Sequence, residues 1–336
     1  MKLDAALPPA SLSQVPVIAR AAEATGFDAL WTTETQHDAF LPHTLIAEHT
    51  TRLRSGTGIA VSFARSPSSI AYQARDLAEQ SGGRFILGMG TQVKAHIERR
   101  FGLEWPESVT GKLREQIQVI RALWDTWQTG APLNFRGEYY KITLMSPFFN
   151  PGPLPPEIAT LPIYIAGVGS GLAKLAGEVC DGFLVHPFHT PRYLSEILLP
   201  AIAQGREKAG RSADPLTVSA TVFAATNRKE REFCRQQVSF YASTPSYHAV
   251  MDLHGWGETA AQLSALAARG QWNEMPALIT EEMMAEFVTE AAAPAALAET
   301  LQKRYANLAG RLALYIPFVP GEKDEFWRDL AGAFNA

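Results

Sequence analysis

The feature that most restricts the fold is a regular alternation of short apolar runs with longer amphipathic stretches. The apolar runs have the length of strands, and most are followed by a stretch with the spacing of a helix. Alternating strands and helices build a parallel sheet, and eight such units over 336 residues favour a closed barrel over a doubly wound sheet. The pattern therefore predicts an α/β fold, a (β/α)8 TIM barrel. The expected strands are 2–7, 27–32, 53–63, 85–90, 162–166, 182–186, 216–224 and 311–318.

Two segments exceed what a minimal barrel needs. Residues 99–160 contain a helical stretch at 108–128, a proline-rich run and the sequence FRGEYY, which is typical of a hairpin or an extended flap. Residues 228–290 are mostly helical and include the aromatic-rich sequence FYASTPSYHAVMDLHGWG. Long insertions on barrels usually belong to the βα loops, which form the active-site face. No stretch has the composition of a linker, so we expect one domain over residues 1–336.

The composition excludes several classes of protein. Hydrophobic residues make up 46% of the chain and charged residues 19%, which is enough apolar material for a full core. The net charge of −4 gives no basic surface for nucleic acid or an anionic membrane. The start, MKLDAALPPASLSQ, lacks the pattern of a signal peptide, and no run of apolar residues is long enough to span a membrane. We expect a soluble cytoplasmic protein.

Several common catalytic motifs are missing. The sequence has no GxSxG, GxxxxGK(S/T) or HExxH pattern, and the first predicted strand ends in Leu7-Pro8-Pro9 instead of a GxGxxG turn. These absences argue against hydrolases, nucleotidases and classical nicotinamide dehydrogenases. The two cysteines have no zinc-like spacing, so we expect no metal site.

The loop after the second predicted strand, WTTETQHDAFLPH, offers a candidate acid–base pair. Glu34 and His37 lie just beyond the strand, where residues of a barrel face the active site. Histidine titrates near neutral pH, and a nearby carboxylate can fix its tautomer. The alternative interpretation is a polar loop without a catalytic role.

Later loops offer candidates for the substrate side. His186 and His189 follow the sixth predicted strand, and Pro187 between them makes a helical metal-binding pair unfavourable. Trp256 lies in the second insertion and could cover the pocket. The alternative is that these side chains pack within their own loops or within a small core of the insertion.

Glycines recur within predicted strands and at their ends. Gly58 lies inside the third strand's apolar run, Gly90 closes the fourth beside Thr91, and the sequence GVGSG after the fifth leads directly into a helix. Backbone N–H groups at such a helix start can bind an anion, and glycine permits close approach of a ligand to the backbone. Together they suggest a large flat or phosphorylated ligand across the barrel rim. A bulge or a tight turn is the simpler alternative at each position.

Three sequences carry a resemblance to a known family. SGGRFILGMG, the preceding GTGIAV strand and IYIAGVGSGLAKLAGEVCDGF resemble the luciferase-like monooxygenase superfamily over nearly the whole chain. WTTETQHDAFLP, FLVHPFHTPRYL and STPSYHAVMDLHGWG are similar to one actinobacterial-type subfamily, whose members are regarded as oxidoreductases using the deazaflavin coenzyme F420. The resemblance implies a TIM barrel with extra loop segments, often assembled as a dimer.

The resemblance also implies where the cofactor would lie. The deazaflavin ring would lie against the third strand, where members of the superfamily often have a non-prolyl cis peptide; here the matching bond is near Gly58-Ile59. Gly90 and Thr91 would lie beside the ring. The phosphate of its tail would lie on the turn formed by Gly167, Val168, Gly169 and Ser170.

The sequence departs from the sugar-phosphate dehydrogenases of this superfamily. Those enzymes have an acidic residue followed directly by a catalytic histidine, whereas Glu34 is followed by Thr35 and the histidine comes at position 37. A glutamate that they carry after the fourth strand is Val93 here, and their phosphate-binding lysine matches His189 or a neighbour. A phosphorylated sugar is therefore disfavoured as the substrate.

These observations lead to one hypothesis and two alternatives. The hypothesis is an F420-dependent oxidoreductase, acting as a homodimer, that moves a hydride between the deazaflavin C5 and a small organic substrate, an alcohol/carbonyl pair or an activated double bond. His37, assisted by Glu34, would transfer the proton, and His186, His189 and Trp256 would shape the substrate side. One alternative is an FMN-dependent monooxygenase using O2, and the other is a cofactor carrier without catalysis.

Overall fold

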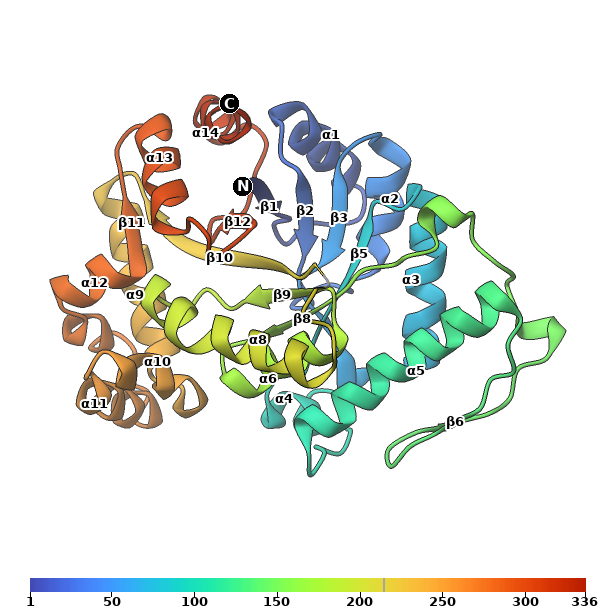
Figure 1. The fold of residues 1–336 in the computed structure, drawn as a ribbon. Helices are drawn as coiled ribbons and strands as arrows, with labels where there is room; N and C mark the ends of the chain where they lie inside the picture. Colours follow the sequence, from blue (N-terminus) through green and yellow to red (C-terminus); the bar gives the residue numbers. More distant parts are fainter. Residues whose placement is uncertain (214) are drawn as a thin grey trace.

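Eight parallel strand positions form a closed barrel, as the sequence predicted (Figure 1). The structure is a computed structural model that describes residues 1–213 and 215–336. Consecutive barrel strands pair in parallel, β1 pairs with β12, and β9 pairs with β10, so the sheet has no open edge in the barrel. The barrel strands are β1 (Lys2–Ala6), β2 (Ala29–Thr32), β3 (Arg54–Thr57) continued by β4 (Ala60–Val61), β5 (Phe85–Gly90), β8 (Ile163–Gly167), β9 (Gly182–Val185), β10 (Thr217–Ala225) and β12 (Arg311–Leu314).

The barrel interior is filled by large side chains. The rings of Trp31 and Tyr164 pack together with Ile86 and Leu184 in a cluster inside the barrel. A Cβ at Gly56 would lie 2.5 Å from a ring atom of Trp31, which explains a glycine within β3. Both faces of a parallel strand are covered, so β5 is buried at all of its six residues.

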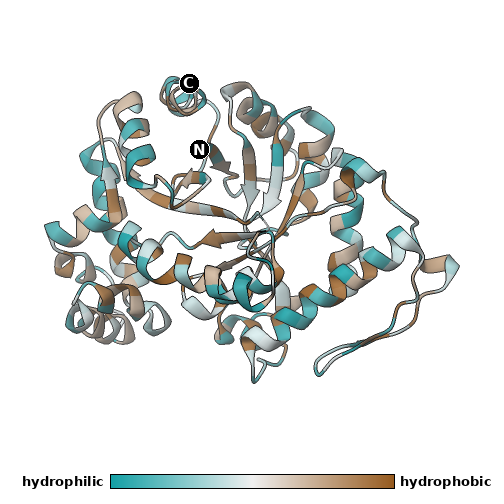
Figure 2. Cartoon of the chain, in the orientation of Figure 1, coloured by the Kyte–Doolittle hydropathy of each residue, from teal (hydrophilic) through white to brown (hydrophobic). Residues whose placement is uncertain are grey.

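Helices surround the barrel, and their apolar faces pack on the strands while polar residues face outward (Figures 1 and 2). Helix starts and ends follow local sequence signals: Ser66 accepts a hydrogen bond from the Ser69 N–H at the start of α3, and Gly26 ends α1 with φ of 97°. The helices are α1 (Val15–Thr25), α2 (Leu41–His49), α3 (Pro67–Ser81), α4 (Lys94–Arg99), α5 (Val109–Thr129), α6 (Ser170–Val179), α7 (Pro191–Tyr193), α8 (Leu199–Lys208), α9 (Arg228–Ala242), α10 (His248–Leu253), α11 (Gly257–Ala268), α12 (Glu281–Phe287), α13 (Pro294–Arg304) and α14 (Asp324–Asn335).

The first predicted insertion combines a barrel helix with an extended flap. Helix α5 packs between α3 and α6, so it takes the place of the helix that follows the fourth barrel strand. The FRGEYY sequence forms the predicted hairpin, with β6 (Phe135–Arg136) antiparallel to β7 (Lys141–Ile142), and it projects away from the barrel (Figure 1). The Glu115 carboxylate anchors the hairpin turn by accepting hydrogen bonds from the N–H groups of residues 138–140.

The second predicted insertion is mostly helical, as expected. Helices α9 to α12 lie together beside the barrel, and β11 (Val288–Glu290) then pairs with the outer part of β10 (Figure 1). Within the described residues no helix combines the length and the apolarity needed to cross a membrane. The expectation of a single domain stays a prediction.

Candidate active site

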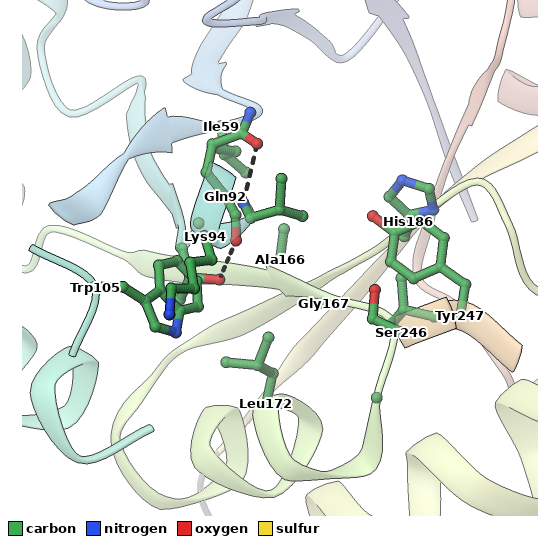
Figure 3. Close-up of a pocket in the computed structure, with 15 residues that line it drawn as sticks. Ile59, Gln92, Lys94, Trp105, Ala166, Gly167, Leu172, His186, Ser246 and Tyr247 are labelled. Carbon is green, nitrogen blue, oxygen red and sulfur yellow. Dashed lines mark hydrogen bonds between the residues drawn. The ribbon is translucent and has the colours of Figure 1, made fainter. Parts of the chain in front are cut away.

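A cavity of about 440 Å³ opens at the carboxyl ends of the barrel strands. Figure 3 shows Lys94 and Trp105 on one side of it and His186, Ser246 and Tyr247 on the other. Its lining comes from the ends of β5, β8 and β9, from the β3–β4 junction and from both insertions. The lining residues are Ile59, Gly90, Thr91, Gln92, Val93, Lys94, Trp105, Ala166, Gly167, Val168, Gly169, Leu172, His186, Ser246 and Tyr247.

The third barrel strand is interrupted at Gly58 and Ile59. The peptide bond between them is cis, which confirms the position expected from the resemblance, and it separates β3 from β4. The side chain of Ile59 lines the cavity, whereas Gly58 lies against Trp31 on the barrel side. The single strand expected over 53–63 is therefore two short strands, β3 and β4, separated by Gly58 and Ile59.

The glycines at the end of β5 are explained by this neighbouring backbone. A Cβ at Gly88 would lie 1.8 Å from the carbonyl oxygen of Thr57, and a Cβ at Gly90 would lie 2.8 Å from a side-chain carbon of Ile59. The Thr57 hydroxyl also donates to the Gly88 carbonyl and accepts from the Gly88 N–H, at 2.6 and 2.9 Å. Close packing between adjacent strands thus accounts for Gly88 and also limits the side chain at Gly90. Gly90 lines the cavity as well, so the approach of a ligand stays a prediction there.

The glycine-rich turn after β8 leads into the cavity floor. At Gly167 a Cβ would lie 2.7 Å from the Leu172 side chain, but at Gly169 no atom lies within 4 Å of a Cβ. Gly169 is the N-cap residue of α6, and no side chain caps this helix start. The open backbone at Gly169 therefore leaves the amino end of α6 accessible, with the partial positive charge of a helix N-terminus.

His186 lines the cavity in a defined tautomer. The N–H of Phe188 donates to Nδ1 of His186 at 3.1 Å, so Nδ1 is an acceptor and the proton of a neutral ring is on Nε2. Burial lowers the pKa of His186 to about 3, which keeps the ring neutral. The ring contacts those of Tyr241 and Tyr247, at centroid distances of 4.8 and 4.9 Å, and the two tyrosine rings also contact each other.

His189 lies behind His186 and does not line the cavity. Its Nδ1–H donates to the carbonyl oxygen of His186 at 2.8 Å, and the Tyr305 hydroxyl donates to its Nε2 at 3.2 Å. Burial lowers the pKa of His189 to about 4. The expected contact of His189 with substrate is therefore replaced by a role within the loop, where it fixes the backbone at His186.

Trp256 also lies outside the cavity lining. Its ring stacks on that of His254 at 4.4 Å, and Nε2 of His254 is hydrogen bonded to the Thr190 hydroxyl at 2.8 Å. These contacts join the second insertion to the loop after β9. The packing interpretation of Trp256, which the sequence left open, fits this position better than a contact with substrate.

The structure does not bring Glu34 and His37 together. The buried Glu34 carboxylate accepts hydrogen bonds from the Val61 N–H and from the Arg65 guanidinium, both at 2.7 Å. Arg65 also pairs with Asp38 at 2.8 Å. His37 is exposed and borders a separate small cavity beside the end of β1. Among the described residues no hydrogen bond joins Glu34 to His37, so the expected assistance of His37 by Glu34 is wrong.

Sequence reasoning missed part of the site. Lys94 and Trp105 come from the segment after β5, and Ser246 comes from the second insertion. Arg65, which binds Glu34 and Asp38, does not line the cavity. Its position at the end of the third predicted strand, next to the strand that the acidic loop follows, was the sequence feature that could have indicated this ion pair. Within residues 1–213 and 215–336 no group of three or more histidine, cysteine or carboxylate side chains is arranged to hold a metal ion.

Comparisons with known proteins place the chain in a family. The profile described as luciferase-like monooxygenase matches residues 2–311. An uncharacterized protein of Mycobacterium tuberculosis is 42% identical over 293 residues, 85% of each chain. The F420-dependent glucose-6-phosphate dehydrogenase of Nakamurella multipartita is 31% identical over 69% of this chain and 68% of its own.

The fold has a close counterpart among solved structures. The coenzyme F420-dependent tetrahydromethanopterin reductase of Methanopyrus kandleri superposes with a TM-score of 0.77 at 23% identity, over 98% of this chain and 97% of that one. This likeness supports the barrel and the course of its loops. Together with the profile match over most of the sequence, it identifies the chain as an enzyme of the luciferase-like monooxygenase family.

Proposed function

We propose that this enzyme is an oxidoreductase that uses coenzyme F420 and moves a hydride between the deazaflavin and a small organic substrate. The observation that carries the proposal is the cavity at the barrel mouth, bounded by the Ile59 side chain and by the open turn at residues 167–170. Relatives named for their F420 dependence support the same cofactor. When bound, the deazaflavin supplies or accepts the hydride at C5, so the chain contributes binding, orientation and exclusion of water.

The residues present fit a flat ring with a phosphorylated tail. Ile59, Trp105 and Leu172 offer apolar surface to a ring, and the uncapped start of α6 offers backbone N–H groups to phosphate oxygens. The open space at Gly169 lets such an oxygen approach the backbone. The cofactor-binding residues we propose are Gly58, Ile59, Gly90, Thr91, Gly167, Val168, Gly169 and Ser170.

The binding experiment uses a reporter within the cavity. Trp105 lines the cavity, so its fluorescence is expected to fall when the deazaflavin binds, and the Trp105→Phe variant should lose most of that change while binding persists by calorimetry. FMN is titrated separately, because the family is described as monooxygenases. Tighter binding of the deazaflavin than of FMN supports the proposal. The reverse preference would favour the flavin monooxygenase alternative, with oxygen consumption as the next assay.

A matched pair of variants tests the phosphate site. Gly169→Asp places a carboxylate at the N-cap of α6, where it stabilises the helix but repels an anion. Gly169→Asn has nearly the same shape without the charge. We expect Gly169→Asp to weaken F420 binding about 10- to 100-fold, corresponding to ~1.4–2.7 kcal/mol, and Gly169→Asn to weaken it much less. A deazaflavin without the phosphate should not distinguish the two variants; if it does, the turn does not bind phosphate.

We also propose that the enzyme is cytoplasmic.

We further propose that the enzyme forms a homodimer. Leu144, Phe148 and Phe149 are 79%, 88% and 56% exposed, which is unusual for a cluster of large apolar side chains. The segment is anchored, since the Tyr72 hydroxyl donates to the Phe149 carbonyl at 2.6 Å. A second copy covering these side chains is the occupant we propose. Phe148→Glu should shift the mass measured by light scattering toward a monomer, and an unchanged mass would remove this surface from the interface.

A further inference from the structure

The two sides of the cavity differ in charge. Among the described lining residues Lys94 alone carries a charged side chain, and Figure 3 shows it on the side opposite His186. The His186 side is made of the neutral imidazole, the Tyr247 ring and the Ser246 hydroxyl. A phosphate or carboxylate group placed there would lose hydration without gaining a cation, which is unfavourable.

The hydroxyl of Tyr241, one of the two tyrosines in contact with His186, already has a partner. The hydroxyl of Tyr241 donates to that of Tyr315 at 2.6 Å, and the Tyr315 hydroxyl donates to Oε1 of Gln237 at 3.1 Å. The Tyr241 ring lies perpendicular to the His186 ring, at an interplanar angle of 89°. Tyr241 therefore offers ring surface more than hydrogen-bonding capacity beside His186.

A row of ring contacts leads from the cavity lining toward the protein surface: His186 and Tyr247 line the cavity, and both contact Tyr241, which does not. Tyr241 contacts Phe240 at a centroid distance of 5.3 Å, and Phe240 contacts Trp272 at 6.0 Å. Phe240 and Trp272 are 47% and 50% exposed, so the row of rings runs from the cavity wall to the surface. Such a row suits a substrate with an apolar or aromatic body that extends beyond the cavity.

The one hydrogen-bond donor with a fixed direction on this side is Nε2–H of His186. Its Nδ1 is bound by the Phe188 N–H, its backbone carbonyl is bound by His189, and Nε2 has no partner among the described residues. A neutral imidazole can donate to a carbonyl oxygen and stabilise the negative charge that develops on it during reduction.

We propose that His186 is a catalytic residue that binds the reacting oxygen of an uncharged ketone or alcohol through Nε2–H, and that the substrate's apolar body packs against the Tyr247 ring. This inference rests on the proposed function and deepens it. It names the substrate class as uncharged aryl or alkyl ketones and the corresponding alcohols. It also assigns the two polar groups to different parts of the cavity. The turn before α6 would bind the phosphate of the cofactor, and the loop after β9 would bind the reacting oxygen of the substrate.

The test begins with the cofactor alone. Binding of F420 is measured by calorimetry for the wild type and for His186→Leu, His186→Gln and His49→Leu, the last being a control at the end of α2, outside the cavity lining. All four should bind with the same Kd within about twofold, because His186 is assigned to substrate and not to cofactor. A wild type that does not bind F420 would overturn the proposed function, and the inference with it, before any ketone is added.

The second stage compares two aryl ketones, one of which carries an additional para carboxylate group. Acetophenone and 4-acetylbenzoate are tested for binding to the protein–F420 complex and for oxidation of the reduced deazaflavin. With wild type we expect kcat/KM for acetophenone to be at least about 10-fold higher, because a carboxylate on the aromatic side would be unpaired. A preference for 4-acetylbenzoate, or neither binding nor turnover of acetophenone by a protein that binds F420, would overturn the inference and leave the proposed function standing.

The variants then test the role of His186 itself. His186→Leu should lower kcat/KM for acetophenone about 100-fold, as expected when an oxyanion-stabilising donor is lost, with cofactor binding unchanged. His186→Gln retains an N–H donor and should recover part of that loss, whereas His49→Leu should behave as wild type. Retention of full kcat/KM by His186→Leu would remove His186 from the reacting oxygen.

Discussion

The loops that follow β2 and β9 each place a histidine just past the end of a barrel strand, but they surround it in opposite ways. After β2, the acidic side chains Glu34 and Asp38 bind Arg65, and His37 is left exposed. After β9, burial lowers the pKa of His186 and His189 to about 3 and 4, and their ring nitrogens bond to backbone and to a tyrosine. Only the second loop presents a histidine to the main cavity.

The comparison shows that a histidine near a carboxylate in sequence does not define an acid–base pair. A buried carboxylate is most stable beside a cation and several donors, and Arg65 with the Val61 N–H meets that need for Glu34. The acidic loop is thereby a structural brace between β2 and β3. The imidazole of the exposed His37 would therefore exchange protons with solvent, and Glu34 would not fix its tautomer.

The largest effect is expected from breaking the brace. Arg65→Met leaves the buried Glu34 without its cation, and we expect the free energy of unfolding to fall by about 2–3 kcal/mol, less than for a fully buried pair because Arg65 is partly exposed. Urea denaturation measures this change. The control is Lys303→Met, which breaks an exposed pair with Glu299 and should lower the free energy of unfolding far less than Arg65→Met does.

A double variant sharpens this prediction. Arg65→Met combined with Glu34→Gln removes both charges, so it should recover part of the stability lost in Arg65→Met alone. The contrary result is additivity, in which the double variant loses the sum of the free energies lost by Arg65→Met and by Glu34→Gln alone. The two side chains would then contribute to stability independently, and their ion pair would have no net energetic effect.

An intermediate effect is expected from the pH dependence of the second loop. The unfolded chain has histidines with a pKa of about 6.5, whereas folded His186 has a pKa of about 3, so between these values the unfolded state binds a proton that the folded state does not. The free energy of unfolding should therefore rise with pH between about 3 and 6.5. The contribution of the neutral His186 to stability should be lost as the pH falls through the same range. His186→Leu should flatten the slope between pH 6 and pH 4.5 by roughly 1.4 kcal/mol per pH unit. Parallel curves for the two proteins would contradict the burial of a neutral His186.

The smallest effect is expected at His37. It is exposed and lies outside the main cavity, so His37→Ala should change stability by less than about 0.5 kcal/mol and kcat/KM by less than about threefold. Steady-state kinetics with the ketone that the wild type reduces best provides the measurement. A loss as large as that of His186→Leu would restore His37 as the proton-transferring residue and reverse the comparison.

The barrel could be predicted from sequence because its signal is distributed. Eight apolar runs, each buried on both faces, mark the strands even where individual bounds shift; the run at 53–63 became β3 and β4, and that at 311–318 ended as a strand at Leu314. The position of the cis bond followed from the resemblance and not from any pattern of residues. Gly88, in the same strand as the predicted Gly90, is explained by the nearby carbonyl oxygen of Thr57, a contact between strands that the sequence does not show.

The site could be predicted only in part because its contacts cross the chain. Glu34 and Arg65 meet because β2 and β3 pair with Thr32 opposite Thr57, a register that the apolar pattern does not specify. The tautomer of His186 depends on the Phe188 N–H, which the turn at Pro187 directs back to the ring. The sequence pattern therefore predicted which loops lie at the active-site end of the barrel. Which side chain of each loop faces the cavity depends on contacts within the folded loop, which the pattern does not contain.

The contact between Gly88 and Thr57 also bears on how this enzyme could acquire new substrates. It joins backbone to backbone, so no exchange of neighbouring side chains makes room for a larger residue at position 88. Position 88, two residues before the lining residue Gly90, is therefore closed to larger side chains. The opposite wall is made of side chains from two loops, and beside His186 it contains Ser246 and Tyr247, where we expect substitutions to leave both the barrel and the proposed catalytic histidine in place. Changes of specificity by laboratory evolution should accordingly accumulate there and spare the end of β5.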